Sequence, residues 1–415
     1  MTKLRKTSIV AATAACGLAA LMGVAAASGT TEASPSAGAT TTPIKHVVVI
    51  FQENVSFDHY FGTYPKATNT SGQVFHAAQH TPSVDGLGNS KGLNGTGTLL
   101  TNNPNRDDAG NQVNPRRLDP GTINDILLCD QDHSYNDEQK AFDNGAMDKF
   151  VTTVGNGART SPTGVPCAKP DVMNYYDGNT VTGLWNYAQQ YAMSDNSFGT
   201  TFGPSAPGAI NLVAGNTGGV GTMINGAATD GDTVSDGNGG NSLIEDAQPY
   251  YDDCSTRDAV ALTGANIGDE LNTAGLSWGW FQGGFRPTTS FAAATGGNQP
   301  TSTFTPDQFK GKFAQPPASD QGLCNAVHPV GIAVGGLGGT ATGPNNYGNK
   351  DDYIAHHEPF QYYASTANPH LLPPASLAAI GTDTQTITAV LDQSGVCSSA
   401  LTSLTMNRCS SSGSE

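Results

Sequence analysis

The chain has 415 residues, 51 of them glycine, and a formal net charge of −16 with only 13% charged residues. The acidic balance argues against nucleic acid as a partner and against docking on anionic lipid, which needs a basic patch; neutral phospholipid stays open. The length suffices for one large domain with insertions or for two domains.

The N-terminus has the pattern of a secretory signal. Three basic side chains among the first six residues precede an Ala-rich apolar stretch, Ile9–Ala27, which ends in small residues. A retained anchor is the alternative, because the stretch approaches the ~20 residues that span a bilayer, but its alanines and glycines make it weakly hydrophobic. We therefore predict a signal peptide over residues 1–27, export to the periplasm or the exterior, and no stable membrane insertion after its removal. Residues 28–43 are predicted to be a disordered spacer.

The first predicted strand ends in polar side chains. The apolar, β-branched run Val47–Phe51 is followed by Gln52, Glu53 and Asn54, which predicts a buried strand with a carboxylate and an amide at its carboxyl end. Ligands bind at this edge of open α/β sheets, and the oxygens of Glu and Asn suit a divalent cation. A strand that leaves the core into a polar turn would give the same pattern, so the residues alone leave both interpretations open.

Helical and strand patterns alternate through the rest of the chain, which predicts an α/β fold with a mainly parallel sheet. Residues 66–121 lack sustained periodicity and are predicted to be loops. The expected helices are Ser134–Phe150, Leu184–Ala192 and Asn266–Ala274, and a further buried strand is expected over Ser277–Gln282.

The segment TTFGPSAPGAINLVAGN places Ser205 between two prolines and ahead of a short predicted helix that includes residues 210–216. Serine before a Pro-containing turn is a good N-cap. A helix N-terminus offers free N–H groups and a positive dipole end to a phosphate, and a serine hydroxyl becomes a nucleophile when a base or a metal activates it. A plain capping serine is the alternative interpretation.

Four segments together resemble one known family: ENVSFDHYFGTYP from Glu53, CDQDHSYNDEQKAFDNGAMDKF from Cys129, MNYYDGNTVTGLWNYAQQYAMSDNSFGTTFGPSAPGAINLVAGN from Met173 and HHEPFQYY from His356. They resemble the bacterial phosphoesterase family, which holds the secreted phosphatidylcholine-type phospholipases C and the respiratory-burst-inhibiting acid phosphatases. The resemblance runs from Ile44 to about Pro374. It implies hydrolysis of phosphoric esters by an alkaline-phosphatase-like α/β/α sandwich with long loop insertions.

The resemblance also implies roles for particular side chains. Ser205 matches the nucleophile that forms a phospho-enzyme, and Glu53 and Asn54 match ligands of a divalent cation whose identity the sequence leaves open. His133 and His357 are the expected catalytic histidines. His357 is preferred over the adjacent His356, although a structural hydrogen bond is the commoner role of a lone histidine. Asp58 is expected to support the loop of the metal ligands.

The substrate implied by the resemblance is a phosphate monoester or a phospholipid headgroup ester. Serine within GPSAPG resembles the phosphatase branch, because the phospholipase C branch carries threonine in a GPTxPNR-like setting. The family's broad range keeps the phospholipid substrate open.

Six cysteines remain once Cys16 leaves with the signal peptide, and an even set in an exported protein indicates disulfides. The spacing of the family segments leads us to expect Cys129–Cys167 and Cys254–Cys324. Cys397 and Cys409 lie in the tail and are expected to be unpaired.

The C-terminal region departs from the family. Residues 381–415 contain no aromatic side chain, end in a Ser-rich stretch and lack the acidic motif that completes the family's metal site. We therefore expect an incomplete phosphoesterase domain over residues 44–380, without its last strands, and an atypical Ser/Thr-rich tail over residues 381–415. Two alternatives follow: a catalytically inactive, truncated family member that binds phosphate or a cation weakly, and an exported surface protein built on Gly- and Asn-rich loops.

Overall fold

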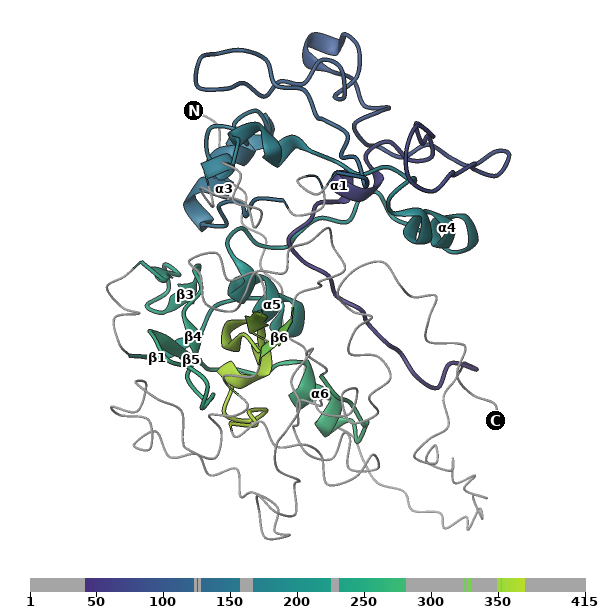
Figure 1. Cartoon of the computed structure of the whole chain (residues 1–415). Coiled ribbons are helices and arrows are strands. Elements are labelled where there is room, and N and C mark those ends of the chain that lie inside the picture. Colours follow the sequence, from purple (N-terminus) through teal and green to yellow (C-terminus); the bar gives the residue numbers. More distant parts are fainter. Residues whose placement is uncertain are drawn as a thin grey trace, which may run out of the picture. The chain divides into compact units, whose positions relative to one another are not determined.

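The computed structural model describes residues 42–122, 125, 128–156, 167–224, 231–280, 324, 327–329, 349–351 and 353–369 (Figure 1). The predicted signal peptide, nearly all of the spacer and the tail lie outside these residues. The chain divides into two units, Met1–Ile50 and Phe51–Glu415. The elements below all belong to the second unit.

The helices of the described residues are short. They are α1 (Phe57–Phe61), α3 (Tyr135–Phe142), α4 (Thr182–Gln190), α5 (Ser205–Ala214) and α6 (Ile267–Thr273), with 3-10 turns at Leu93–Gly95, Asp143–Gly145, Val154–Asn156, Lys169–Met173, Ala355–His357 and Pro359–Tyr362. The helices expected from Leu184 and from Asn266 are confirmed as α4 and α6. The helix expected over Ser134–Phe150 is shorter than predicted, because Asp143 takes a left-handed conformation (φ 42°) and ends α3.

The strands form small sheets. A three-stranded sheet has the order β1 (Val220–Ile224), β5 (Ala259–Leu262), β4 (Gln248–Pro249); β2 (Thr233–Ser235) pairs with β3 (Asn241–Leu243), and β6 (Val327–Pro329) with β7 (Asn349–Asp351). Only β4–β5 is a parallel pair among these strands. The mixed α/β organisation is therefore confirmed, but the described strands are not mainly parallel. The described chain between β1 and β5 contains the β2–β3 hairpin and no helix. Parallel neighbours need a long crossover, which is usually a helix, so this connection favours antiparallel pairing. The α/β/α sandwich itself stays a prediction.

Strand β5 is buried on both faces, which fits its apolar sequence. Val260 and Leu262 pack with Ile210 of α5 and with Tyr362. Ala259 and Ala261, one residue out of phase, pack with Tyr250 and other side chains on the opposite face. The hydroxyl of Tyr362 donates to the carbonyl oxygen of Ala247 at 2.7 Å. This core fixes α5, and with it Ser205, against the sheet.

Two predicted strands are corrected. Val47–Phe51 carries no strand, and its apolar side chains are exposed, Val47 and Val48 by 82% each. A buried strand needs neighbouring strands to take up its backbone hydrogen bonds, and no described residue pairs with this run. Residues 277–279 also carry no strand, and residues 281–282 lie outside the described part. Trp278 and Trp280 instead pack on Phe360, with ring centroids 4.7 and 5.6 Å away.

A second cluster joins α1 and α4 to the loop that follows α1. Trp185 is fully buried among Tyr64, Phe75 and other side chains, and its indole N–H donates to the carbonyl oxygen of Tyr60 at 2.7 Å. Gly178 lies directly against this indole, so that a Cβ there would approach it to 2.4 Å. Glycine is therefore needed at residue 178.

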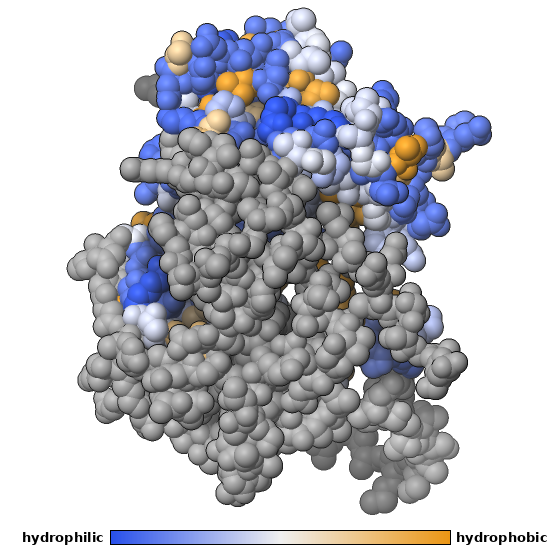
Figure 2. Space-filling view, in the orientation of Figure 1, coloured by the Kyte–Doolittle hydropathy of each residue, from blue (hydrophilic) through white to orange (hydrophobic). Residues whose placement is uncertain are grey.

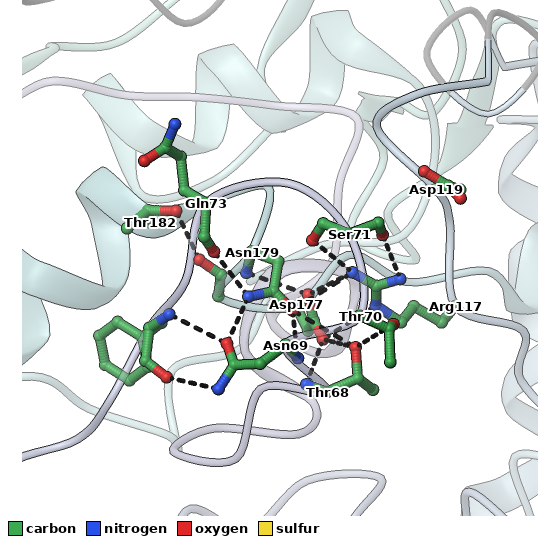
Figure 3. Close-up of polar contacts among 12 residues, drawn as sticks. Thr68, Asn69, Thr70, Ser71, Gln73, Arg117, Asp119, Asp177, Asn179 and Thr182 are labelled. Carbon is green, nitrogen blue, oxygen red and sulfur yellow. Dashed lines mark hydrogen bonds and ion pairs between the residues drawn. The ribbon is translucent and has the colours of Figure 1, made fainter.

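A polar network fixes the loop Thr68–Gln73 beside this cluster (Figure 3). Arg117 donates from Nε and Nη2 to the two carboxylate oxygens of Asp177, at 2.9 and 3.2 Å. Asn69 and Asn179 exchange hydrogen bonds of 2.8 and 2.7 Å. Since Asp177 is only 1% exposed, the pair is a buried ion pair that holds three separate segments together.

Both expected disulfides are present, Cys129–Cys167 and Cys254–Cys324, with Cα–Cα distances of 5.8 and 5.2 Å. Among the described residues no helix is long and apolar enough to cross a membrane. On the face shown in Figure 2, the described surface is mostly hydrophilic, with small hydrophobic patches.

Candidate functional site

Ser205 is the first residue of α5, and the N-cap is Pro204. The expectation that Ser205 is the N-cap is therefore wrong by one position; no side-chain hydrogen bond caps this helix. Gly203 takes a left-handed conformation (φ 105°), and a Cβ there would lie 2.7 Å from the carbonyl oxygen of Ile244. The tight turn before Ser205 thus requires glycine and leaves the serine hydroxyl free of a capping role.

One carboxylate attaches helix α3 to this turn, and a second attaches it to the segment that follows β3. Glu138 accepts the N–H of Gly203 at 2.7 Å, and Glu245 accepts the N–H of Tyr135 at 3.0 Å. Burial raises the pKa of both carboxyl groups, and the backbone hydrogen bonds oppose this. These contacts bring the start of α3, and His133 just before it, to the Ser205 turn.

His133 has an acidic environment. Its Nε2 lies 3.1 Å from Oδ1 of Asp130. The hydrogen bond to Asp130 raises the pKa of His133; burial opposes it, and the charges of Asp130, Glu138 and Asp246 add to the increase. The imidazole therefore stays protonated to a higher pH than a free histidine does.

Asp246 lies between the start of α5 and the histidine pair. Its Oδ1 accepts the N–H of Ala206 at 2.9 Å, and its Oδ2 lies 3.6 Å from Nε2 of His356. Burial raises the pKa of Asp246, while the hydrogen bond from Ala206 and the positive charges of Arg257, His357 and His133 lower it. Asp246 thus contacts both the first turn of α5 and His356, and its charge interacts at longer range with His357 and His133.

The adjacent histidines face different carboxylates. Both lie in the 3-10 turn Ala355–His357, and their rings meet edge to face with centroids 4.6 Å apart. Nε2 of His357 lies 3.3 Å from Oε1 of Glu53, and the His357 side chain is 28% exposed against 17% for His356. His357 is therefore the more accessible of the two, next to one of the expected metal ligands.

The expected cation ligands are only partly assembled. Glu53 and Asn54 are exposed, and Asn54 takes a left-handed conformation (φ 66°). In the part of the chain that the structure describes, no group of three or more His, Cys, Asp or Glu side chains is arranged to hold a metal ion. The described donors therefore do not fit a complete divalent-cation site, which needs four ligands for zinc and six or more for calcium or magnesium, water included, and we assign no chemical step to a cation.

Asp58 and His59 are directed to structural contacts. Oδ1 of Asp58 is buried against the Gly86 loop without a hydrogen-bond partner among the described residues. Burial raises the pKa of Asp58 to about 6; a hydrogen bond from the backbone of Leu87 opposes this and the charge of Asp85 adds to it. Nδ1 of His59 lies 2.8 Å from the carbonyl oxygen of Asn174, a contact that connects α1 to a distant segment of the chain.

Sequence reasoning missed Glu138, Glu245, Asp246 and Arg257. A signal was present for the middle two. Glu245 and Asp246 directly follow the apolar pair Leu243 and Ile244, the same apolar-to-acidic change that drew attention to Glu53. Glu138 and Arg257 carry no such local signal, because their roles depend on contacts between distant segments.

A model of the Phosphoesterase family matches residues 44–327, more than half of the 415-residue chain. The matched range contains Glu53, His133, Ser205 and Asp246, and it ends before the His356–His357 pair. The resemblance seen in the sequence motifs is thereby confirmed for this range.

Proposed function

The chain belongs to the Phosphoesterase family, and from this premise we propose that it hydrolyses phosphoric esters with Ser205 as the nucleophile. Family membership supports phosphoric-ester hydrolysis in general. The observation that carries the finer proposal is the contact of Asp246 with both the first turn of α5 and His356, the neighbour of His357. The N-terminus of α5 offers a partial positive charge to a bound phosphate.

The proposed reaction has two steps. The oxygen of Ser205 attacks phosphorus and passes its proton to His357, while the bond to the ester oxygen breaks and the leaving alcohol takes a proton from His133. Water then attacks the phospho-serine and gives one proton to His133, and Ser205 recovers its proton from His357. Inorganic phosphate and the alcohol are released and both histidines return to their starting states. The raised pKa of His133 suits it to donate the first proton.

We propose small phosphate monoesters as the preferred substrate, on the strength of the GPSAPG segment. A phospholipid headgroup ester is the second candidate, because the net charge of −16 disfavours anionic but not neutral lipid. Export after removal of residues 1–27 belongs to the same proposal. A cation held by Glu53 and Asn54 would need further ligands beyond those that the described residues supply.

A catalytically inactive family member is the alternative function. It is favoured by one observation: the described donors around Glu53 do not complete a cation site. Such a protein would still bind phosphate at the start of α5, but it would not turn over.

The test is phosphate release from a chromogenic phosphomonoester by the mature chain, with and without added divalent cations. Ser205→Ala should lower kcat by roughly a thousandfold or more, whereas Ser197→Ala, an exposed serine nearby, should leave it unchanged. A parallel assay with phosphatidylcholine vesicles separates the two substrate classes. A folded wild-type chain without activity on either substrate would contradict the hydrolase and favour the inactive alternative.

A further inference from the structure

Arg257, His356 and Asp246 form a connected set of contacts next to the start of α5. Nη2 of Arg257 donates to the backbone carbonyl of Asp246 at 2.6 Å and lies 3.4 Å from Nδ1 of His356. Nε2 of His356 faces Oδ2 of Asp246 at 3.6 Å. Because Oδ1 of Asp246 accepts the N–H of Ala206, the set reaches the residue after Ser205.

The chemistry of these groups selects one form of His356. A guanidinium only donates hydrogen bonds, so Nδ1, which faces Arg257, has to be the acceptor nitrogen. Burial, together with the positive charges of His357 and Arg257, lowers the pKa of His356 to about 3. The ring is therefore neutral at neutral pH. A neutral ring whose Nδ1 accepts carries its proton on Nε2, the nitrogen that faces the carboxylate of Asp246.

We propose that Asp246 and Arg257 are positioning residues that hold His356 as the neutral Nε2–H tautomer and fix it against the first turn of α5. The inference rests on the proposed function, since this arrangement affects turnover only if Ser205 and His357 carry the reaction. Asp246 then ties together both halves of the site: the helix of the nucleophile through Ala206, and the histidine pair through His356.

His356 and His357 have different roles in this arrangement. Both nitrogens of His356 face protein groups, Arg257 on one side and Asp246 on the other, so neither is directed to substrate. The His356 ring packs edge to face on the ring of His357 at 4.6 Å and so fixes the orientation of the more accessible histidine. His356 acts through His357 and is itself a positioning residue.

The first experiment examines the wild-type chain and does not depend on activity. Nitrogen-15 NMR of the imidazole rings in the full mature chain, assigned by comparison with His356→Gln, should show an unprotonated Nδ1 and a protonated Nε2 for His356 at neutral pH. A protonated Nδ1, or a doubly protonated ring, would overturn the inference whether or not the protein is a phosphatase.

The second experiment measures the variants. Asp246→Asn keeps an oxygen that can accept from Ala206 but removes the charge, and Arg257→Met removes the donor to Nδ1. Each should produce a mixture of His356 tautomers in the NMR spectrum and lower kcat about 10- to 100-fold with KM little changed. Asp236→Asn, which alters a carboxylate bonded to backbone N–H groups in an exposed hairpin turn, is the control and should change neither.

The outcomes separate the inference from the proposed function. A wild-type chain that releases no phosphate but shows the expected tautomer, lost in Asp246→Asn, contradicts the proposed function and supports the positioning arrangement. An active wild type whose Asp246→Asn variant keeps both the tautomer and kcat overturns the inference alone. If Asp246→Asn fails to fold, the Arg257→Met variant and the wild-type NMR spectrum test the inference in its place.

Discussion

At the scale of single residues, the contacts that a side chain makes, and not its residue type, decide whether it is available for chemistry. His356 and His357 share one sequence context, yet one is directed to Asp246 and Arg257 and the other to Glu53. The side chains of neighbouring residues in a 3-10 turn point in different directions. The sequence alone does not show which carboxylate each side chain will contact. The preference for His357 over His356 could thus come from family resemblance but not from the residues.

Asp58 is a buried carboxyl group whose effect on the free energy of unfolding can be tested. Its pKa in the folded protein, about 6, lies above the ordinary value of 3.8, so the folded state binds the proton more tightly than the unfolded state does. The free energy of unfolding should therefore fall as the pH rises from about 4 to about 6. Asp58→Asn should remove this part of the pH dependence and raise stability at pH 7 by at most roughly 3 kcal/mol.

Urea unfolding of both proteins across this pH range checks the prediction. Asp108→Asn, at a 63% exposed carboxylate paired with Lys169, is the matched control and should follow the wild-type pH curve. An Asp58→Asn variant that is less stable than the wild type at pH 7 would show that its carboxylate makes a favourable charged interaction instead.

At the scale of elements, the loop Thr68–Gln73 depends on one buried ion pair (Figure 3). Burial by itself would raise the pKa of Asp177, but hydrogen bonds from Arg117 and from the N–H groups of Thr68 and Asn179 outweigh it and lower the pKa below 3.8. The stability that this group contributes is present above that pH and is lost as the pH falls through the lower, folded-state pKa.

Arg117→Met should destabilise the protein by about 3–5 kcal/mol at neutral pH, because it leaves the carboxylate of Asp177 buried without its countercharge. Urea unfolding measures the loss, and acidification should reduce it as Asp177 becomes protonated. Lys169→Met, which breaks the exposed pair with Asp108, should cost about 1 kcal/mol or less. Equal losses in the two variants would contradict a structural role for the buried pair.

Elements with local signals could be predicted from the sequence, and elements that depend on distant partners could not. Asn266 is the N-cap of helix α6, and its side chain accepts the N–H groups of Gly268 and Asp269, so neighbouring residues in the sequence determine where this helix starts. The run Val47–Phe51 has an equally clear strand pattern, but a pattern supplies no partner strand. Asp246 follows an apolar pair, but this local signal does not show its importance, which comes from contacts with Ala206 and His356, far from it in the sequence.

At the scale of the whole molecule, the two disulfides were predictable because an exported chain with an even set of cysteines is expected to form them, each closing a long loop between family segments. Cys129–Cys167 closes 38 residues and Cys254–Cys324 closes 70; loops of this length restrict the unfolded chain by about 4 kcal/mol each in the chain-entropy description. Cys254 also packs with Tyr353 and Ala355. The second disulfide therefore supports the segment that carries the histidine pair.

The exposed run Val47–Phe51 has a further consequence for the whole molecule. Its five apolar side chains are between 52% and 82% exposed, and an uncharged β-branched run of this kind is typical of segments that pair with one another. Burial of apolar surface contributes about 25 cal/mol per Å², so association of two copies through this run is favourable. We expect the mature chain to form concentration-dependent oligomers, and Val48→Lys to suppress them by placing a charge in the pairing surface.

Size-exclusion chromatography with light scattering, over a dilution series, measures this association. Val74→Lys is the matched control, because Val74 is also an exposed valine, 63% accessible, but lies outside the run; it should associate as the wild type does. Since Val48 has no role in the proposed reaction, phosphate release per chain should be the same in Val48→Lys and the wild type at low concentration. A wild-type chain that stays monomeric at every concentration would show that the run does not pair. A Val74→Lys variant that dissociates as fully as Val48→Lys would show that general surface charge, and not this run, governs association.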